Sequence, residues 1–145
     1  LHDALPIWLI TADKISAFLT KNGKPKMLVV YTSWCPYCKQ MMPSLLSLWR
    51  DKKIPEDQLI MVSLDDNLTA LSQYLIDSGL HEMTPVPLIF SDKKGKLSAV
   101  LQSHQSGYKG GIPYIGFFAA DGTMIDEIAG AASKSDIEDA LVNLK

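Results

Sequence analysis

The chain contains only two cysteines, Cys35 and Cys38, and they stand three positions apart where an apolar run meets an amphipathic segment. The run "KMLVVYTS" (residues 26–33) is apolar and rich in β-branched residues, which is typical of a buried central strand. The next segment, "CPYCKQMMPSLLSLWR" (residues 35–50), has a broad apolar face, and Pro36 suits the first turn of a helix. The sequence therefore predicts a strand followed by a helix whose N-terminus carries both thiols.

Three roles are open to a C-x-x-C pair in this position. A structural disulfide would close a very short loop, which stabilises a fold only slightly. A zinc site would need more ligands, but there is no second cysteine pair and the histidines, His2, His81 and His104, lack ligand-like spacing. In a redox pair, the amides and dipole of the helix N-terminus favour a thiolate at Cys35, and Cys38 can attack the mixed disulfide that Cys35 forms. We favour the redox pair, expect no metal or other cofactor, and expect Cys35 to be partly exposed and Cys38 more buried.

Segments typical of helices and strands alternate along the rest of the chain. Strands are predicted at residues 58–64 and 86–91, a hairpin at 113–130, and helices at 14–21, 68–78 and from Ser133 onward. Asp65, Asp66 or Asn67 can cap the helix at 68–78, and the segment 97–101 has no clear assignment. With 47% hydrophobic and 21% charged residues the composition is globular. These patterns predict one α/β domain with a central mixed sheet flanked by helices.

The first seven residues, "LHDALPI", show no periodicity. Read back into codons, they resemble the end of a common sequencing adapter. We therefore expect residues 1–7 to be a translated adapter and residues 8–145 to form the domain, with a genuine irregular N-terminus as the alternative. If residues 1–7 are an adapter product, any signal peptide or membrane anchor that preceded the domain has been lost from this sequence.

Two separated motifs resemble the thioredoxin family. "MLVVYTSWCPYCKQMMP" resembles the active-site strand and helix, including Trp34 before the motif, Lys39 after it and the kinking Pro43. "GGIPYIGFFAADGTMIDEIAGAASKSDIEDAL" resembles the C-terminal half of that family, and the resemblance covers most of residues 26–145. It implies a thiol–disulfide oxidoreductase with Cys35 as nucleophile and Cys38 as resolving thiol, acting on protein clients and served by an upstream redox partner.

The same resemblance implies where a client would bind. Pro113 matches the cis-proline of the family, and Ile112, the residue before it, would pair its backbone with the client chain as an added strand does. Pro87, in "TPVP", is an alternative position for the cis-proline. We expect Trp34, Pro36 and Tyr37 to contact the client as well. Two more aromatic residues, Tyr108 and Tyr114, either rim the same groove or belong to the core.

Three departures from a minimal thioredoxin are visible. Cys38 and Pro113 are farther apart than in such a protein, which predicts an αβ insertion between the C-x-x-C helix and the cis-proline strand, after "LIMVSLDDN", carrying a helix, a strand and a loop. This enlarged middle resembles the envelope reductases of the TlpA/ResA kind. Val29 stands where thioredoxins have a buried acid, and Met41 stands where ResA-like proteins have a glutamate.

The proton of Cys38 must therefore be handled by water or by a group that the sequence does not identify. His104, in the loop before Pro113, is either such a group or a solvated loop residue. The sequence gives no candidate carboxylate for this role.

Two classes of function remain. The first is a monomeric enzyme that exchanges disulfides with proteins. We expect it to act as a reductase in the bacterial envelope, with the cytoplasm as the alternative location. The second is a non-catalytic client-binding or chaperone module on the same scaffold. The net charge of −2 and the absence of a cluster of basic residues argue against a nucleic-acid partner. No stretch approaches the roughly 18 apolar residues of a membrane-spanning helix. The direction of electron flow depends on the stability of the reduced pair in the fold, and the sequence does not predict it.

Overall fold

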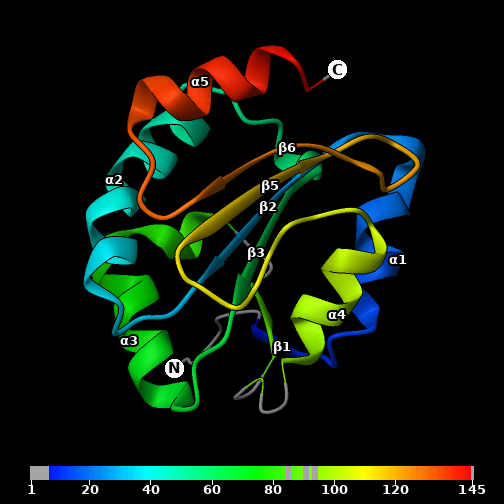
Figure 1. Ribbon diagram of the computed structural model, residues 1–145. Coiled ribbons are helices and arrows are strands. Elements are labelled where there is room, and N and C mark those ends of the chain that lie inside the picture. Colours follow the sequence, from blue (N-terminus) through cyan, green and yellow to red (C-terminus); the bar gives the residue numbers. More distant parts are fainter. Residues whose placement is uncertain (1–6, 84–85, 90–91, 93–94, 145) are drawn as a thin grey trace.

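The computed structural model describes residues 7–83, 86–89, 92 and 95–144. Its centre is a six-stranded mixed sheet with the strand order β1-β4-β3-β2-β5-β6 (Figure 1). The first four strands in that order are parallel, β5 is antiparallel to β2, and β6 is antiparallel to β5. The strands are β1 (Ile7–Leu9), β2 (Lys26–Tyr31), β3 (Leu59–Ser63), β4 (Val86–Leu88), β5 (Tyr114–Phe118) and β6 (Met124–Ala129).

Helices cover both faces of this sheet. Figure 1 shows α2, α3 and α5 on one face and α1 and α4 on the other. The helices are α1 (Lys14–Thr20), α2 (Pro36–Arg50), α3 (Leu68–Ser78), α4 (Lys96–Ser103) and α5 (Lys134–Val142). In the part of the chain that the structure describes, no helix has the length and apolar character needed to cross a membrane.

Strand β2 is buried on both sides, which explains its uninterrupted apolar sequence. Because side chains alternate along a strand, Val29 and Tyr31 pack into the core under α2, α3 and α5, whereas Leu28 and Val30 pack into the core under α1 and α4. The strand therefore holds the start of α2 in a fixed position relative to both layers.

The segment between β3 and β5 contains α3, β4, α4 and a loop, as the predicted insertion requires. The segment 97–101, which the sequence left unassigned, lies in α4. Leu97 and Leu101 are fully buried on one face of this helix, and the carboxylate of Asp92 accepts a hydrogen bond from the backbone N–H of Leu97 at 3.2 Å. These two buried leucines, one turn apart, form the face by which α4 packs on the core.

At the N-terminus, β1 pairs in parallel with β4, and Ile7 lies opposite Val86. Ile7 is partly buried and packs against the core under α2, α3 and α5. The boundary predicted between residues 7 and 8 lies within β1, and residues 1–6 lie outside the described part of the chain.

Candidate active site

Cys35 and Cys38 lie at the N-terminus of α2, directly after the central strand. Cys35 is the N-cap residue with an extended backbone, and its Sγ accepts a hydrogen bond from the backbone N–H of Cys38 at 3.1 Å. Pro36 is the first helical residue, where a missing N–H is harmless. Both cysteines are free thiols in this structure. The helix N-terminus thus directs a backbone donor at the first sulfur.

The exposure of the two cysteines differs from the prediction in one respect. Cys38 is completely buried, as expected, but only 4% of Cys35 is exposed, so the expectation of a partly exposed Cys35 is wrong. Its side chain caps the helix and packs in the core cluster that also contains Cys38 and Tyr31. The neighbouring aromatic residues take the exposed positions instead, with Trp34 62% and Tyr37 66% exposed.

The thiol of Cys38 lies in surroundings that favour its neutral form. Burial raises the pKa of Cys38 to about 12, with the hydrogen-bonded sulfur of Cys35 and the charge of Asp65 acting in the same direction. The backbone N–H of Thr32 acts in the opposite direction, because it can donate to the thiolate. Release of this proton therefore needs help from other groups.

Asp65, two residues beyond the end of β3, is a site residue that the sequence reasoning missed. It is 1% exposed and accepts hydrogen bonds from the backbone N–H of Ser33 at 2.9 Å, from the Ser33 hydroxyl, and from the Ser63 hydroxyl at 2.5 Å. It therefore anchors the loop that carries Cys35. The sequence reasoning had considered Asp65 only as a helix cap, but Asn67 caps α3 by accepting the N–H of Ala70 at 3.0 Å.

The loop before β5 contains the expected cis-proline. The Ile112–Pro113 peptide bond is cis, in agreement with the prediction, and the Pro113 carbonyl accepts the backbone N–H of Gly130 at 2.9 Å. Ile112 packs against both core clusters. The alternative, Pro87, lies within β4 opposite Trp8, and its peptide bond is not among the cis bonds of the described residues.

Two further predictions from the sequence are resolved by packing. His104 contacts the Ser16 hydroxyl through Nε2 at 2.8 Å and the Gly122 carbonyl through Nδ1 at 2.9 Å, so it joins α1 to the β5–β6 turn. Both of its ring nitrogens are occupied there, which excludes the proposed relay in this arrangement. Tyr108 and Tyr114 are almost fully buried and stack with ring centroids 4.8 Å apart, so they belong to the core and not to a groove.

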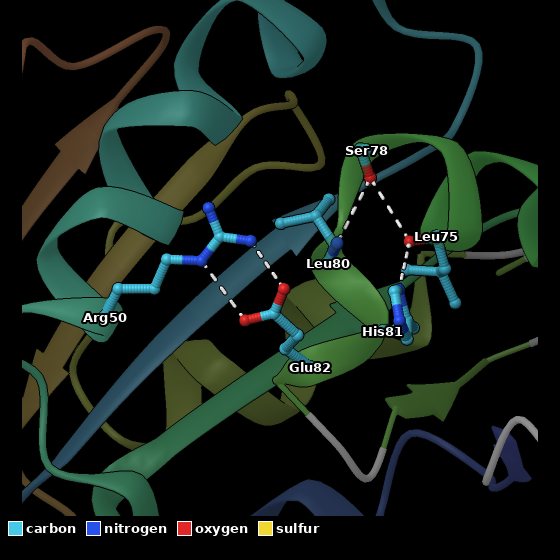
Figure 2. Close-up of polar contacts among 6 residues, drawn as sticks. All are labelled: Arg50, Leu75, Ser78, Leu80, His81 and Glu82. Atoms are coloured by element: carbon cyan, nitrogen blue, oxygen red, sulfur yellow. Dashed lines mark hydrogen bonds and ion pairs between the residues drawn. The ribbon is translucent and has the colours of Figure 1, made fainter.

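A cavity of about 400 Å³ lies between α2 and α3, on the same side of the sheet as Cys38. It is lined by Lys39, Met42, Pro43, Leu46, Ser47, Arg50, Asp51, Tyr74 and Ser78. Beside it, Arg50 at the end of α2 forms a double hydrogen bond with Glu82, which follows α3 (Figure 2). Figure 2 also shows the Ser78 hydroxyl bonded to the Leu75 carbonyl and to the backbone N–H of Leu80. The Arg50–Glu82 pair joins the end of α2 to the segment after α3, and the Ser78 bonds close the C-terminal end of α3.

No group of histidine, cysteine and acidic side chains that could hold a metal ion occurs among the residues described by the structure. Two thiols at the N-terminus of a helix that follows the central strand, together with a cis-proline directly before the neighbouring strand β5, are typical of α/β proteins with a redox-active C-x-x-C pair. The chain matches the thioredoxin-like domain family over residues 15–145 and belongs to that family. The fold predicted from the sequence, a thioredoxin-like α/β fold with an αβ insertion, is confirmed.

Comparison with individual proteins agrees with this family. The chain is 28% identical over 119 residues to the thiol-disulfide oxidoreductase ResA of Oceanobacillus iheyensis, which covers 81% of this chain and 55% of ResA. The chain thus spans little more than half the length of this curated relative.

Two solved structures share the fold. One is a thioredoxin-family thiol:disulfide interchange protein from Chlorobium tepidum, with a TM-score of 0.65, 20% identity, and 89% of this chain and 83% of that chain covered. The other is a secreted Mycobacterium tuberculosis disulfide oxidoreductase homologous to DsbE of E. coli, with a TM-score of 0.59, 21% identity, and coverage of 84% and 83%.

Proposed function

We propose that this protein is a thiol–disulfide oxidoreductase that reduces disulfides of client proteins. The observation that carries the proposal is the sulfur of Cys35, which caps α2 and accepts the backbone N–H of Cys38 at 3.1 Å. A donor in this position stabilises negative charge on the sulfur, and the thiolate is the nucleophile in disulfide exchange. The name of the ResA relative, thiol-disulfide oxidoreductase, supports the same chemistry.

The reaction proceeds in two exchange steps. The Cys35 thiolate attacks a client disulfide, forms a Cys35–client mixed disulfide and releases one client thiolate, which takes up a proton. Cys38 then loses its proton and attacks Cys35, so that the second client thiolate leaves. The client disulfide is thereby reduced to two thiols, and the protein is oxidised to a Cys35–Cys38 disulfide. An upstream protein dithiol restores the reduced pair.

The client is held by the surface around the thiols. Trp34, directly before Cys35, and Tyr37, directly before Cys38, are exposed aromatic residues, and Pro36 and Tyr37 lie between the cysteines. The backbone of Ile112, before the cis-proline Pro113, pairs with an extended client segment as an added strand. The protein acts as a monomer in the bacterial envelope, and the similarity to a secreted disulfide oxidoreductase of M. tuberculosis supports this location.

The proposal is tested by reduction of insulin with dithiothreitol as the electron donor. The wild-type protein is expected to accelerate insulin reduction, and Cys35→Ser to abolish the acceleration because no nucleophile remains. Cys38→Ser is expected to attack once and stay attached to its client as a mixed disulfide. Equal rates for wild type and Cys35→Ser would contradict the proposal. If the double variant Cys35→Ser/Cys38→Ser still bound unfolded insulin while the wild type showed no exchange, a non-catalytic client-binding module would be the correct function.

A further inference from the structure

Cys38 must become a thiolate before it can resolve the mixed disulfide, and its surroundings oppose this change. Burial raises the pKa of its thiol to about 12, and the Asp65 carboxylate adds to the effect. Val29 and Met41 stand at the two positions where a carboxylate was expected by resemblance, and both are buried apolar side chains. The backbone N–H of Thr32 is one group that favours the thiolate. A second donor near the sulfur would make the resolving step faster.

The hydroxyl of Tyr74 is such a donor. Tyr74 lies on α3, lines the cavity between α2 and α3, and packs its ring against the core cluster that contains Cys38. Its hydroxyl is buried and has no hydrogen-bond partner among the residues described. A buried polar group without a partner is uncommon and destabilising, so each one calls for an explanation. The O–H group of Tyr74 is therefore free to donate a hydrogen bond to a further partner in this core.

The charges that act on Tyr74 support Cys38 as this partner. Burial raises the pKa of Tyr74 to about 12, and of the charges acting in the same direction that of Cys38 is the largest, followed by Cys35 and Asp65. For Tyr31, whose hydroxyl is also buried and unpartnered within the described chain, burial comes first and the charge of Asp65 exceeds that of Cys38. Tyr74 also shares the lining of the cavity with Lys39, the residue that follows Cys38 on α2.

Asp65 is not suited to stabilise the Cys38 thiolate. Its oxygens already accept hydrogen bonds from Ser33 and Ser63, and its negative charge opposes a thiolate at Cys38. The titratable groups that surround Cys38 are Cys35, Tyr31, Asp65, Tyr74 and Tyr108. Of the three tyrosines, Tyr74 is the one for which the charge of Cys38 comes first among the charges that act on it.

We propose that the Tyr74 hydroxyl donates a hydrogen bond to the Cys38 sulfur while that sulfur loses its proton and attacks the mixed disulfide. The proposal rests on the function proposed above and adds a residue to the same site. In this step the Cys38–Cys35 sulfur bond forms, the Cys35–client bond breaks, and the client sulfur leaves as a thiolate that receives the proton of Cys38. Tyr74 keeps its own proton, and no further oxidant or reductant is needed.

The test is the variant Tyr74→Phe, which removes the hydroxyl and keeps the ring. Reduced protein is mixed with oxidised glutathione, and acid-quenched samples are analysed by mass spectrometry to resolve formation and decay of the glutathione adduct at Cys35. The decay, which is the attack by Cys38, is expected to slow roughly tenfold at neutral pH, as loss of a hydrogen bond to a charged group predicts. Its pH–rate profile is expected to move to higher pH. Adduct formation, measured in the Cys38→Ser background, is expected to stay unchanged.

Tyr108→Phe is the matched control, because it also removes a buried hydroxyl without a partner in the described chain. Tyr108 lies in the other core cluster, and the charge of Asp92 acts on it more than that of Cys38 does. It is expected to leave the decay rate unchanged. A second readout is the ultraviolet titration of the Cys38 thiolate in the Cys35→Ser background, where Tyr74→Phe is expected to raise the pKa of Cys38.

Three results would overturn the role of Tyr74. These are a decay rate within twofold of wild type, an equal slowing of formation and decay, or an equal effect of Tyr108→Phe. In each of these results the wild type still exchanges with glutathione, so the proposed function stands. A wild-type protein that forms no adduct would overturn both.

Discussion

Cys38 and Glu127 are two residues whose pKa values change on folding in opposite directions, so they affect the pH dependence of stability in opposite ways. The fold keeps the Cys38 thiol neutral by burial, whereas hydrogen bonds hold Glu127 as a carboxylate. Because the pKa of each residue differs between the folded and the unfolded state, each makes the free energy of unfolding depend on pH.

Cys38 should make the reduced protein less stable at high pH. Its pKa is raised in the folded state to about 12 from about 8.5 in an unfolded chain. The contribution of the neutral Cys38 thiol to the free energy of unfolding is therefore fully present below about pH 8.5. It is lost as the pH rises toward the folded pKa, because the thiol ionises first in the unfolded chain. Urea unfolding of the reduced protein at pH 7 and pH 10 is expected to show a larger loss of stability than for Cys38→Ser. Equal losses would contradict the assignment.

Glu127 should act in the opposite direction. Burial opposes its ionisation, but hydrogen bonds from the Tyr114 hydroxyl, the Ser106 hydroxyl and the Gly107 N–H outweigh burial and lower its pKa. Its stabilising effect is then present above an unfolded pKa of about 4.3 and is lost as the pH falls through the lower folded value. Glu127→Gln is expected to be less stable than wild type at pH 7 and equally stable near pH 2, as measured by thermal unfolding. A difference that persists at pH 2 would show that packing, not charge, is responsible.

Residues of this kind mark the limit of prediction from the sequence. Cys35 and Cys38 are identifiable because their chemistry follows from their spacing. Asp65 and Tyr74 are not, because each belongs to a different part of the chain. Only the packing of β3 and α3 with β2 and α2 brings Asp65 to the loop before Cys35 and Tyr74 into the core cluster of Cys38. Missing carboxylates at Val29 and Met41 predicted that some other group was needed, but not which one.

Strand β5 shows how one element depends on the absence of a side chain. Gly116 lies between Tyr114 and Phe118, which occupy the same face of the strand. A Cβ atom at Gly116 would be 2.5 Å from Cε1 of Phe118 and 2.8 Å from the Tyr114 hydroxyl oxygen. In the core under α1 and α4, the side chains of Tyr114 and Phe118 therefore occupy the space that a side chain at Gly116 would need.

Gly116→Ala is expected to destabilise the protein by about 1–3 kcal/mol, the usual range for an overpacked core. Gly111→Ala is the matched control, since a Cβ at Gly111 has no atom within 4 Å among the described residues and its φ is not in the left-handed region. Chemical denaturation should leave the control close to wild type. If both variants behave alike, the close approach at β5 is not what requires glycine.

Elements with strong patterns were predicted and weaker ones were not. The all-buried strand β2, the long amphipathic helix α2 and the hairpin of β5 and β6 follow from apolar runs and turn residues. Helix α4 did not, because it has eight residues and two buried leucines, which is also compatible with a strand. Its helical form depends on packing against α1, and the residues of the segment alone do not predict that contact.

At the scale of the whole molecule, the exposed large apolar side chains are distributed over several elements. They are Trp8, Leu9, Trp34, Tyr37, Leu68, Ile76, Ile125 and Val142. Trp34 directly precedes Cys35, beyond the end of β2. Trp8 lines a cavity with Lys26 and Leu59, the first residues of β2 and β3, and so lies at the opposite end of the sheet.

Trp34→Ala is expected to lower kcat/KM for insulin about tenfold or more, because exposed aromatic residues supply much of the contact energy in protein recognition. The rate with oxidised glutathione is expected to change little, since so small a disulfide does not need a docking surface. Trp8→Ala is the control and is expected to leave both rates unchanged. Equal losses for insulin and glutathione would mean that Trp34 shapes the thiol site itself.

The pairing of β2 with β5 also has a consequence for how the protein is made. Val29 lies opposite Ile115 and Met27 opposite Phe117, so the central strand is completed only by residues from the last third of the chain. A ribosome therefore releases both thiols well before the strand that closes the sheet beside them, and until then one edge of β2 is an open template for pairing with other chains. Contacts so distant in sequence also form slowly. During synthesis the thiols meet the surrounding redox environment before the fold protects Cys38.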